Sequence, residues 1–391
     1  MVPPAARLGQ IPPYLFGELA RARAKAKAEG RDLIDLGIGD PDQPTPGPIL
    51  AALTRAAHDP ATHRYDESDA GWPPFLASVA RWYRRRFSVE LDPDSEVLLL
   101  IGSKEGLAHL AWAYIDPGDL ALVPDPAYTV YKMNTLLAGG DVHGMPLQAE
   151  NGFLPVLEEI PEVIADHARL LYLNYPNNPT GATAPLEFFT KVVEFARRHH
   201  LIVCHDCAYS EVYFDGYRPP SFLQAPGAKE VGIEIHSVSK TFNMTGWRVG
   251  FAVGNPEVLQ ALNRLKSNID SKQFPAVDRA AAYALDTWTE DRETLRLYQR
   301  RRDILVSGLN RLGWNLRPPK ATFYVWAPVR PGYTSAEFAK LLLERAGILV
   351  APGNGYGEYG EGYVRMALTV SGDKNGERLE EAVDRLASAL S

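Results

Sequence analysis

A lysine flanked by small hydroxyl residues is the feature of the sequence that most clearly predicts chemistry. Lys240 stands between Ser239 and Thr241, directly after an apolar run that ends at Ser237. A lysine amine can form a Schiff base with an aldehyde cofactor, and nearby cationic groups help to keep such an amine reactive. Arg248 follows eight residues later, so Ser237 and Arg248 could bind a phosphate on the same side. A lone buried lysine is more often a paired structural one, but these neighbours favour an exposed, ligand-facing loop.

A carboxylate at the end of an apolar run is the second feature. Asp206 follows the run at residues 201–204, and Tyr209 comes three residues later. In an open α/β sheet, ligands bind beyond the carboxyl ends of the strands. A carboxylate buried there needs a partner. A protonated pyridine nitrogen would supply one, while Tyr209 could hydrogen-bond the phenolic oxygen of the same ring. A role of Asp206 as a helix N-cap also explains this motif.

Two turn sequences could complete a cofactor site. Residues 174–181 are rich in asparagine, proline and glycine; turn chemistry explains much of this composition, and Asn178 could also donate to a phenolic oxygen. Residues 102–106 read Gly-Ser-Lys-Glu-Gly, a strand-to-helix turn whose backbone N–H groups favour an anion. Because this turn lacks the G-x-x-x-x-G-K-[ST] pattern, it disfavours a nucleoside triphosphate.

Short apolar runs predict the strands that must position these motifs. Several are nearly continuous in valine, isoleucine and leucine, as strands buried on both faces should be. They lie at Val97–Ile101, Leu120–Val123, Leu170–Leu173, Leu201–His205, Ile233–Ser237 and Val249–Val253. Apolar residues at helical spacing predict helices at Phe75–Phe87, Lys104–Ile115 and Pro185–His200. The alternation predicts an α/β domain around a mostly parallel sheet.

The C-terminal part predicts a smaller α+β domain. Helices are expected at Glu290–Arg311, Ser335–Ala346 and Gly376–Ala389, and strands at Thr322–Trp326 and Tyr363–Leu368. The proline-rich N-terminal segment is expected to pack with this part, because prolines at 44, 46 and 48 mark a boundary before a helix at Ile49–Ala57. We therefore predict a large domain at residues 48–280 and a small domain formed by residues 1–47 and 281–391.

Length and charge narrow the class of protein. A chain of 391 residues is too long for one ordinary core, which favours two domains. Lysine and arginine number 41 against 48 acidic residues, and this mildly acidic balance without a basic stripe argues against nucleic acid as a partner. No apolar stretch reaches ~20 residues and residues 1–10 lack the apolar core of a signal peptide, so a membrane is not expected.

The two cysteines, Cys204 and Cys207, have the C-x-x-C spacing. A structural zinc site would need two further ligands at suitable spacing, and there is no second cysteine pair. Two small residues at a strand end are the favoured interpretation, and no metal is predicted. So few cysteines predict no disulfide framework, which fits a cytoplasmic protein.

Together these motifs resemble those of the class I and II aminotransferases, which share the aspartate-aminotransferase fold, fold type I of the pyridoxal-phosphate enzymes. The similarity extends from about Gly37 to the C-terminus and keeps the order of the motifs. It implies pyridoxal 5'-phosphate on Lys240, with Asp206 as the pyridinium partner. It also implies Tyr209 and Asn178 at the phenolic oxygen and Tyr128 stacked on the ring. The phosphate site would be formed by Ser103, Lys104, Ser237 and Arg248, and Ser239 would be a further contact to the cofactor.

The same resemblance implies how substrates bind. Arg365 matches the arginine that grips both oxygens of a substrate α-carboxylate with its guanidinium fork. The other substrate contacts implied are Gly39, Lys104, Tyr128, Asn178 and Asn268. Tyr65 resembles a tyrosine that reaches the phosphate of the neighbouring subunit, so a homodimer with shared active sites is expected. The substrates implied are an amino acid and a 2-oxo acid such as 2-oxoglutarate.

A narrower resemblance is to the LL-diaminopimelate aminotransferases of lysine biosynthesis. Residues 37–42, 101–106, 150–155 and 266–271 carry it. The segment 66–71 departs from the family, since it reads one residue longer. Because this segment helps to form the family's substrate site, donors such as aspartate, alanine or an aromatic amino acid stay open. For LL-diaminopimelate, Lys104 and Asn268 could serve the distal carboxylate, and Glu67 or Asp69 the distal ammonium.

Other classes of function have less support. A regulatory protein that binds the cofactor, or a β-lyase or decarboxylase on the same fold, would use the same ring chemistry. The presence of Arg365 favours transamination of α-amino acids over these other functions. A dehydrogenase is disfavoured, because no predicted strand is followed by G-x-G-x-x-G.

Overall fold

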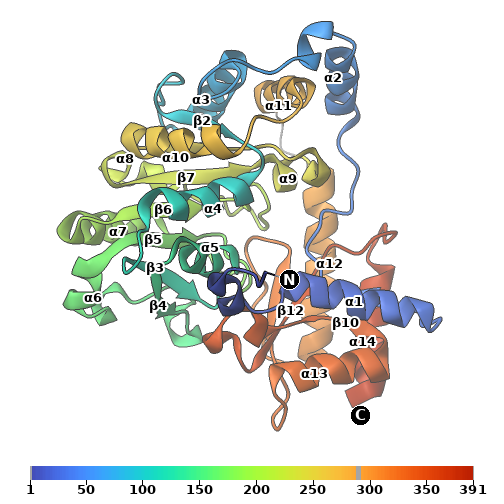
Figure 1. Ribbon diagram of the computed structural model, residues 1–391. Helices are drawn as coiled ribbons and strands as arrows, with labels where there is room; N and C mark the ends of the chain where they lie inside the picture. The colour runs from blue at the N-terminus through green and yellow to red at the C-terminus, as the bar shows by residue number, and fades with distance from the viewer. Residues whose placement is uncertain (1, 288–291, 391) are drawn as a thin grey trace.

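The large sheet has seven strands in the order β2-β8-β7-β6-β5-β3-β4 (Figure 1). The strands are β2 (Val97–Leu100), β3 (Leu120–Asp125), β4 (Asp141–Pro146), β5 (Ala168–Asn174), β6 (Ile202–Asp206), β7 (Gly232–Ser237) and β8 (Gly250–Gly254). Only β8 runs against its neighbours; the other pairings are parallel. The mostly parallel sheet predicted from the sequence is therefore confirmed. The computed structural model describes residues 2–287 and 292–390.

All six predicted strands are present in this sheet, with ends that differ by one or two residues. The seventh, β4, was missed. It forms an edge of the sheet, and most of its residues are exposed or half-buried. Its residues include Asp141, His143 and Gly144, so no apolar run marks it in the sequence.

Helices cover both faces of the sheet, as an α/β domain requires. One face packs against α3 (Pro73–Phe87), α7 (Leu186–His199) and α11 (Pro275–Thr287). The other packs against α4 (Ser103–Tyr114), α5 (Val130–Ala138) and α10 (Pro256–Ile269). The other helices of this part are α2 (Gly47–Ala57), α6 (Glu162–His167), α8 (Ala228–Val231) and α9 (Val238–Thr241). The predicted helices at α3, α4 and α7 are confirmed.

Parallel pairing brings distant sequence motifs to one edge of the sheet. The strands β5, β6 and β7 end at Asn174, Asp206 and Ser237, and Asn174 lies directly beside Asp206 in the β5–β6 register. The turn at residues 101–103 and the short helix α9 begin at the same edge. Ser103, Asp206 and Lys240 therefore line the same cavity, although they lie far apart in the chain.

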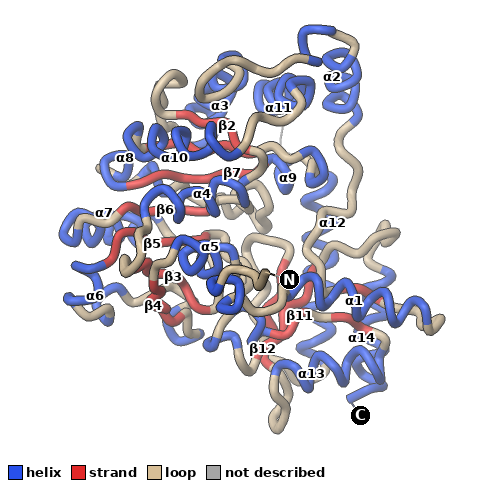
Figure 2. The backbone as a smooth tube through the Cα atoms, in the orientation of Figure 1, coloured by secondary structure: helices blue, strands red, loops and turns tan. Residues whose placement is uncertain are grey.

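The C-terminal part has its own antiparallel sheet, β11-β12-β9 (Figure 2). Its apolar side chains form a separate buried cluster. Its elements are α12 (Arg292–Arg311), β9 (Tyr324–Pro328), α13 (Ser335–Leu341), β10 (Ile348–Leu349), β11 (Ala351–Pro352), β12 (Tyr363–Ala367) and α14 (Glu377–Leu390). A π-helical turn at Leu342–Ala346 continues α13. The predicted start of the long helix at Glu290 lies outside the described residues.

The N-terminal segment reaches this part through a strand and a buried arginine. The strand β1 (Ile34–Asp35) pairs with β10, and α1 (Leu15–Ala28) precedes it. Arg301 is fully buried and donates from Nη1 and Nη2 to the two oxygens of Asp42, at 2.9 and 2.8 Å. The domain boundaries at residues 47 and 280 stay a prediction; residue 280 lies within α11. Within the described residues, no helix is long and apolar enough to cross a membrane.

Candidate active site

A cavity of about 370 Å³ lies at the carboxyl edge of the large sheet. The ends of β5, β6 and β7, the first turn of α4 and the short helix α9 form its walls. Most site residues predicted from the sequence line it: Gly39, Ser103, Lys104, Tyr128, Asn178, Asp206, Tyr209, Ser237, Ser239, Lys240 and Arg248. The fold thus brings four separate sequence motifs into one space.

Lys240 points its amine into this cavity from α9. The helix follows β7 without a loop, and Ser237 caps it by accepting a hydrogen bond from the Ser239 N–H at 3.2 Å. Burial lowers the pKa of Lys240 to about 8, an effect that Asp40 opposes and Arg248 reinforces. A neutral amine is a nucleophile, so Lys240 is suited to attack an aldehyde. The expectation of an exposed loop here is wrong, because α9 holds the side chain half-buried.

Asp206 is a buried carboxylate whose partners in the chain are neutral donors. The Tyr131 hydroxyl donates to Oδ2 at 2.7 Å, and the Ala208 N–H donates to Oδ1 at 3.3 Å. Burial raises the pKa of Asp206, and these two bonds oppose the rise. A cationic ligand in the cavity would favour the ionised form. The residues after Asp206 form a turn, so the N-cap alternative is wrong.

Arg365 lies fully buried behind the cavity and orients Asn178. Its Nη1 donates to Asn178 Oδ1 at 2.8 Å, and its Nη2 donates to the Gly37 carbonyl at 2.7 Å. Because the amide oxygen of Asn178 is occupied, its NH₂ group is the part left to donate into the cavity. Arg365 also stacks on Tyr324, and the Tyr324 hydroxyl lies 2.9 Å from that of Tyr209.

The turn before α4 and Arg248 lie together at the cavity and offer donors that suit an anion. Gly102 has a φ of +79°, and a Cβ there would lie 2.3 Å from Arg248 Nη2, so only glycine fits. The N–H groups of Ser103 and Lys104 belong to the first helical turn, where backbone donors have no partner within the helix. These donors and a guanidinium suit a phosphate. An aromatic aldehyde with a phosphate group and a basic ring nitrogen fits the Lys240, Asp206 and phosphate positions together.

Two predicted site residues lie elsewhere. Tyr65 is 84% exposed and lines a second cavity of about 1160 Å³, together with Glu67 and Asp69. Asn268 is exposed near the end of α10 and donates to the carbonyl of Arg264 in its own helix. Neither lines the Lys240 cavity of this chain.

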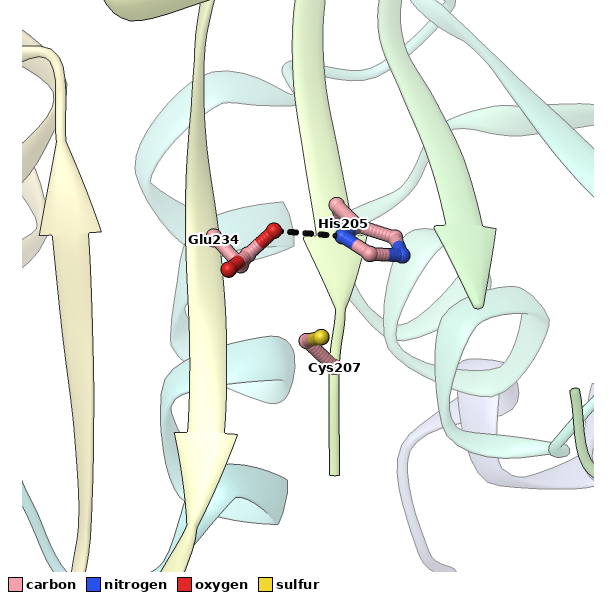
Figure 3. A group of neighbouring side chains, drawn as sticks. All are labelled: His205, Cys207 and Glu234. Atoms are coloured by element: carbon pink, nitrogen blue, oxygen red, sulfur yellow. Dashed lines mark hydrogen bonds and ion pairs between the residues drawn. The ribbon is translucent and has the colours of Figure 1, made fainter. Parts of the chain in front are cut away.

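His205, Cys207 and Glu234 lie close enough to hold a metal ion (Figure 3). The Glu234 carboxylate already accepts hydrogen bonds from five donors. His205 donates to it at 2.7 Å. The other four donors are Tyr83, Ser221, His236 and the Phe222 N–H. Burial raises the pKa of the Cys207 thiol, so it stays protonated and is a poor ligand. This group is a structural hydrogen-bond network that joins β6 to β7.

Sequence reasoning missed several residues of the site. Ile38 and Asn174 line the cavity and lie inside motifs that were recognised. Tyr324 and Tyr131 sit in ordinary apolar patterns on β9 and α5, where nothing distinguishes them from core residues. Tyr14 precedes α1 at the opposite end of the chain from most other lining residues, and no local pattern marks it.

Comparisons with known proteins agree with this geometry. The family model "Aminotransferase class I and II" matches residues 31–386. An LL-diaminopimelate aminotransferase from Moorella thermoacetica is 58% identical over 99% of this chain and 98% of its own length. The substrate-bound BacF structure from Bacillus subtilis has a TM-score of 0.94 at 38% identity, covering 99% and 98% of the two chains. A probable N-succinyldiaminopimelate aminotransferase from Thermus thermophilus has a TM-score of 0.90 at 41% identity, covering 96% and 100%.

The lowered pKa of Lys240 predicts the pH dependence of its reaction. In cofactor-free protein, trapping of an aromatic aldehyde by cyanoborohydride at Lys240 should rise with pH around a midpoint of about 8, because only the neutral amine attacks. Peptide mapping after trapping measures the extent of labelling at Lys240 at each pH. Free Nα-acetyl-lysine, whose side-chain pKa is ~10.4, serves as the reference. A midpoint equal to that of the reference would show that burial does not activate this amine.

Proposed function

The chain belongs to the class I and II aminotransferases, and on that premise we propose that it uses pyridoxal 5'-phosphate bound to Lys240. We propose further that it transfers an amino group from LL-diaminopimelate to a 2-oxo acid such as 2-oxoglutarate. The observation that carries the cofactor proposal is the convergence of Lys240, Asp206 and the anion site on one cavity. The donor proposal rests on the 58% identity to a relative of that name.

Each residue of the cavity has a distinct task in this proposal. When bound, pyridoxal phosphate supplies an electron-withdrawing ring that stabilises a carbanion at the substrate Cα. Asp206 holds the ring nitrogen protonated, and Arg248 with the first turn of α4 binds the phosphate. Lys240 is suited to move a proton near neutral pH, because its pKa is lowered to about 8. Ser237 and Ser239 assist at the phosphate, and Tyr128 stacks on the ring.

Two further residues orient the cofactor ring in this proposal, and a third binds the substrate. Asn178 and Tyr209 donate to the phenolic oxygen, which fixes the tilt of the ring. Arg365 binds the substrate α-carboxylate, and its Nε has no hydrogen-bond partner among the described residues. Fixing that carboxylate orients the Cα–H bond that must break.

We also propose that two copies of the chain form a dimer and share their active sites. Tyr65 and Phe274 are aromatic side chains that line the second cavity and are exposed by 84% and 45%. Gln273 Oε1 is buried in the same region without a hydrogen-bond partner in the described chain. A second copy that covers this surface would bring Tyr65 and Asn268 to the partner's cofactor.

The proposed donor carries an ammonium and a carboxylate at its distal end, and each needs a partner on leaving water. Lys104 has an exposed side chain at the cavity, with its Nζ 3.4 Å from the Tyr14 hydroxyl. Together with Asn268 of a second copy, it would bind the distal carboxylate. Glu67 and Asp69 are exposed acidic residues of the segment that carries Tyr65, and they would bind the distal ammonium in the dimer.

Asp206→Asn should lower kcat by a hundredfold to a thousandfold or more, on the order of the ~3–5 kcal/mol that breaking a buried ion pair costs. The substitution keeps the shape of the side chain but removes the charge that holds the ring nitrogen protonated. Steady-state kinetics with a saturating donor measure the effect. A change confined to KM would contradict this role of Asp206.

Hybrid dimers test the shared sites. A Lys240→Ala chain and a Tyr65→Phe/Asn268→Ala chain should each be inactive alone. Mixed under conditions that exchange subunits, they should recover part of the activity, because one of the two sites in each hybrid is then intact. Native mass spectrometry verifies that hybrids form. Hybrids without activity would contradict sharing.

A donor series tests the substrate. With 2-oxoglutarate as acceptor, kcat/KM should be highest for LL-diaminopimelate and much lower for lysine, which lacks the distal carboxylate. N-succinyl-LL-diaminopimelate should also be poor, because its distal nitrogen is a neutral amide that Glu67 and Asp69 would not attract. If aspartate, an aromatic amino acid or the succinylated donor exceeds LL-diaminopimelate by about tenfold, a gap of ~1.4 kcal/mol, the donor proposal is wrong.

A further inference from the structure

Glu105 lies in the first turn of α4, the turn whose backbone N–H groups belong to the proposed phosphate site. Its Oε2 accepts a hydrogen bond from the Ile101 N–H at 2.9 Å, and its Oε1 lies 2.7 Å from His109 Nδ1. Lys266 of α10 places its Nζ 3.3 Å from Oε2. The side chains of Glu105 and Lys266 are only 12% and 4% exposed, so this ion pair is largely removed from water.

The bond to Ile101 fixes the shape of the turn. Ile101 precedes Gly102, whose positive φ turns the chain from β2 into α4. With the Ile101 N–H directed to Glu105, the N–H groups of Ser103 and Lys104 remain for a ligand in the cavity. Glu105 therefore defines which backbone donors form the anion site.

A carboxylate so close to an anion site creates an electrostatic problem. A helix N-terminus favours a negative charge, but a phosphate at the same terminus would be repelled by Glu105. Lys266 is a buried cation beside Glu105 Oε2, the same oxygen that accepts from the Ile101 N–H, and its Nζ also lies 4.0 Å from Asp270 Oδ2. Glu105, His109 and Asp270 are close enough to hold a metal ion, but the Lys266 ammonium already supplies a positive charge beside two of them.

We propose that Glu105 and Lys266 are a positioning pair for the phosphate of the cofactor. Glu105 holds the turn in its binding shape, and Lys266 cancels the charge with which Glu105 would repel the phosphate. Neither side chain lines the Lys240 cavity, so both act through the turn. This inference rests on the proposed function, since it presumes that pyridoxal phosphate binds there.

Binding of pyridoxal phosphate and of phosphate-free pyridoxal to cofactor-free protein tests the pair. Glu105→Gln should weaken the binding of pyridoxal phosphate about tenfold, because a neutral amide oxygen holds the Ile101 N–H less strongly than a carboxylate does, and it should leave the binding of pyridoxal nearly unchanged. Glu96→Gln is a matched control, because Glu96 also pairs with a lysine, Lys229 at 2.6 Å, and accepts a backbone N–H from Asp92. It should change neither affinity.

Charge rescue separates positioning from a general loss of stability. Lys266→Met leaves the Glu105 charge unbalanced, so it should weaken pyridoxal phosphate more than Glu105→Gln does. Adding Glu105→Gln to Lys266→Met should restore affinity to the level of Glu105→Gln alone, and Lys266→Arg should keep the affinity. These comparisons use variants whose circular dichroism matches that of the unsubstituted protein.

Three results would overturn the proposal for this pair. The variants could lose equal affinity for pyridoxal phosphate and pyridoxal, or lose affinity for neither. The double variant could also bind pyridoxal phosphate more weakly than Lys266→Met does. A failure of Lys266→Met or Glu105→Gln to fold would also overturn it, because the pair would then support the fold and not the phosphate alone. If the unsubstituted protein does not bind pyridoxal phosphate at all, the proposed function fails instead.

Discussion

Lys240 and Asp206 each place an ionisable group where burial opposes its charge, and the two groups share one small cavity. The chain tolerates Asp206 because Tyr131 and a backbone N–H donate to it, and it tolerates Lys240 because the amine is readily neutral. A ligand with a cationic ring nitrogen and an aldehyde would satisfy both groups. The cavity thus suits a cofactor that carries both an aldehyde and a basic ring nitrogen.

The parallel sheet brings the ionisable groups of the cavity together from distant positions in the chain. Parallel strands end at the same edge, so Asn174, Asp206 and Ser237 meet there without long loops. Short elements then place the reactive groups: α9 holds Lys240, and the turn before α4 forms the anion site. The C-terminal part adds Arg365 behind the cavity through β12, and Arg365 in turn orients Asn178.

Most strands of the large sheet and most residues of the candidate site were predictable from the sequence. The residues that were missed have physical reasons for it. Buried strands are visible as apolar runs, and reactive residues stand out when they interrupt such runs, as Asp206 and Lys240 do. The edge strand β4 has no apolar run because it is largely exposed. Tyr131 and Tyr324 look like core residues, and only their hydroxyl contacts reveal a role. Tyr65 and Asn268 were predicted from family resemblance alone, and the task proposed for them requires a second copy of the chain.

Chemical reduction of the cofactor-loaded protein tests the central claim most directly. Borohydride converts a reversible carbon–nitrogen double bond into a stable amine, so it fixes an aldehyde cofactor to the lysine that holds it. After reduction and proteolysis, mass spectrometry should find the phosphopyridoxyl group on the peptide that contains Lys240. The yellow colour of the protein should be lost at the same time. A label on another lysine, or none on a protein that turns over substrate, would contradict the assignment of Lys240.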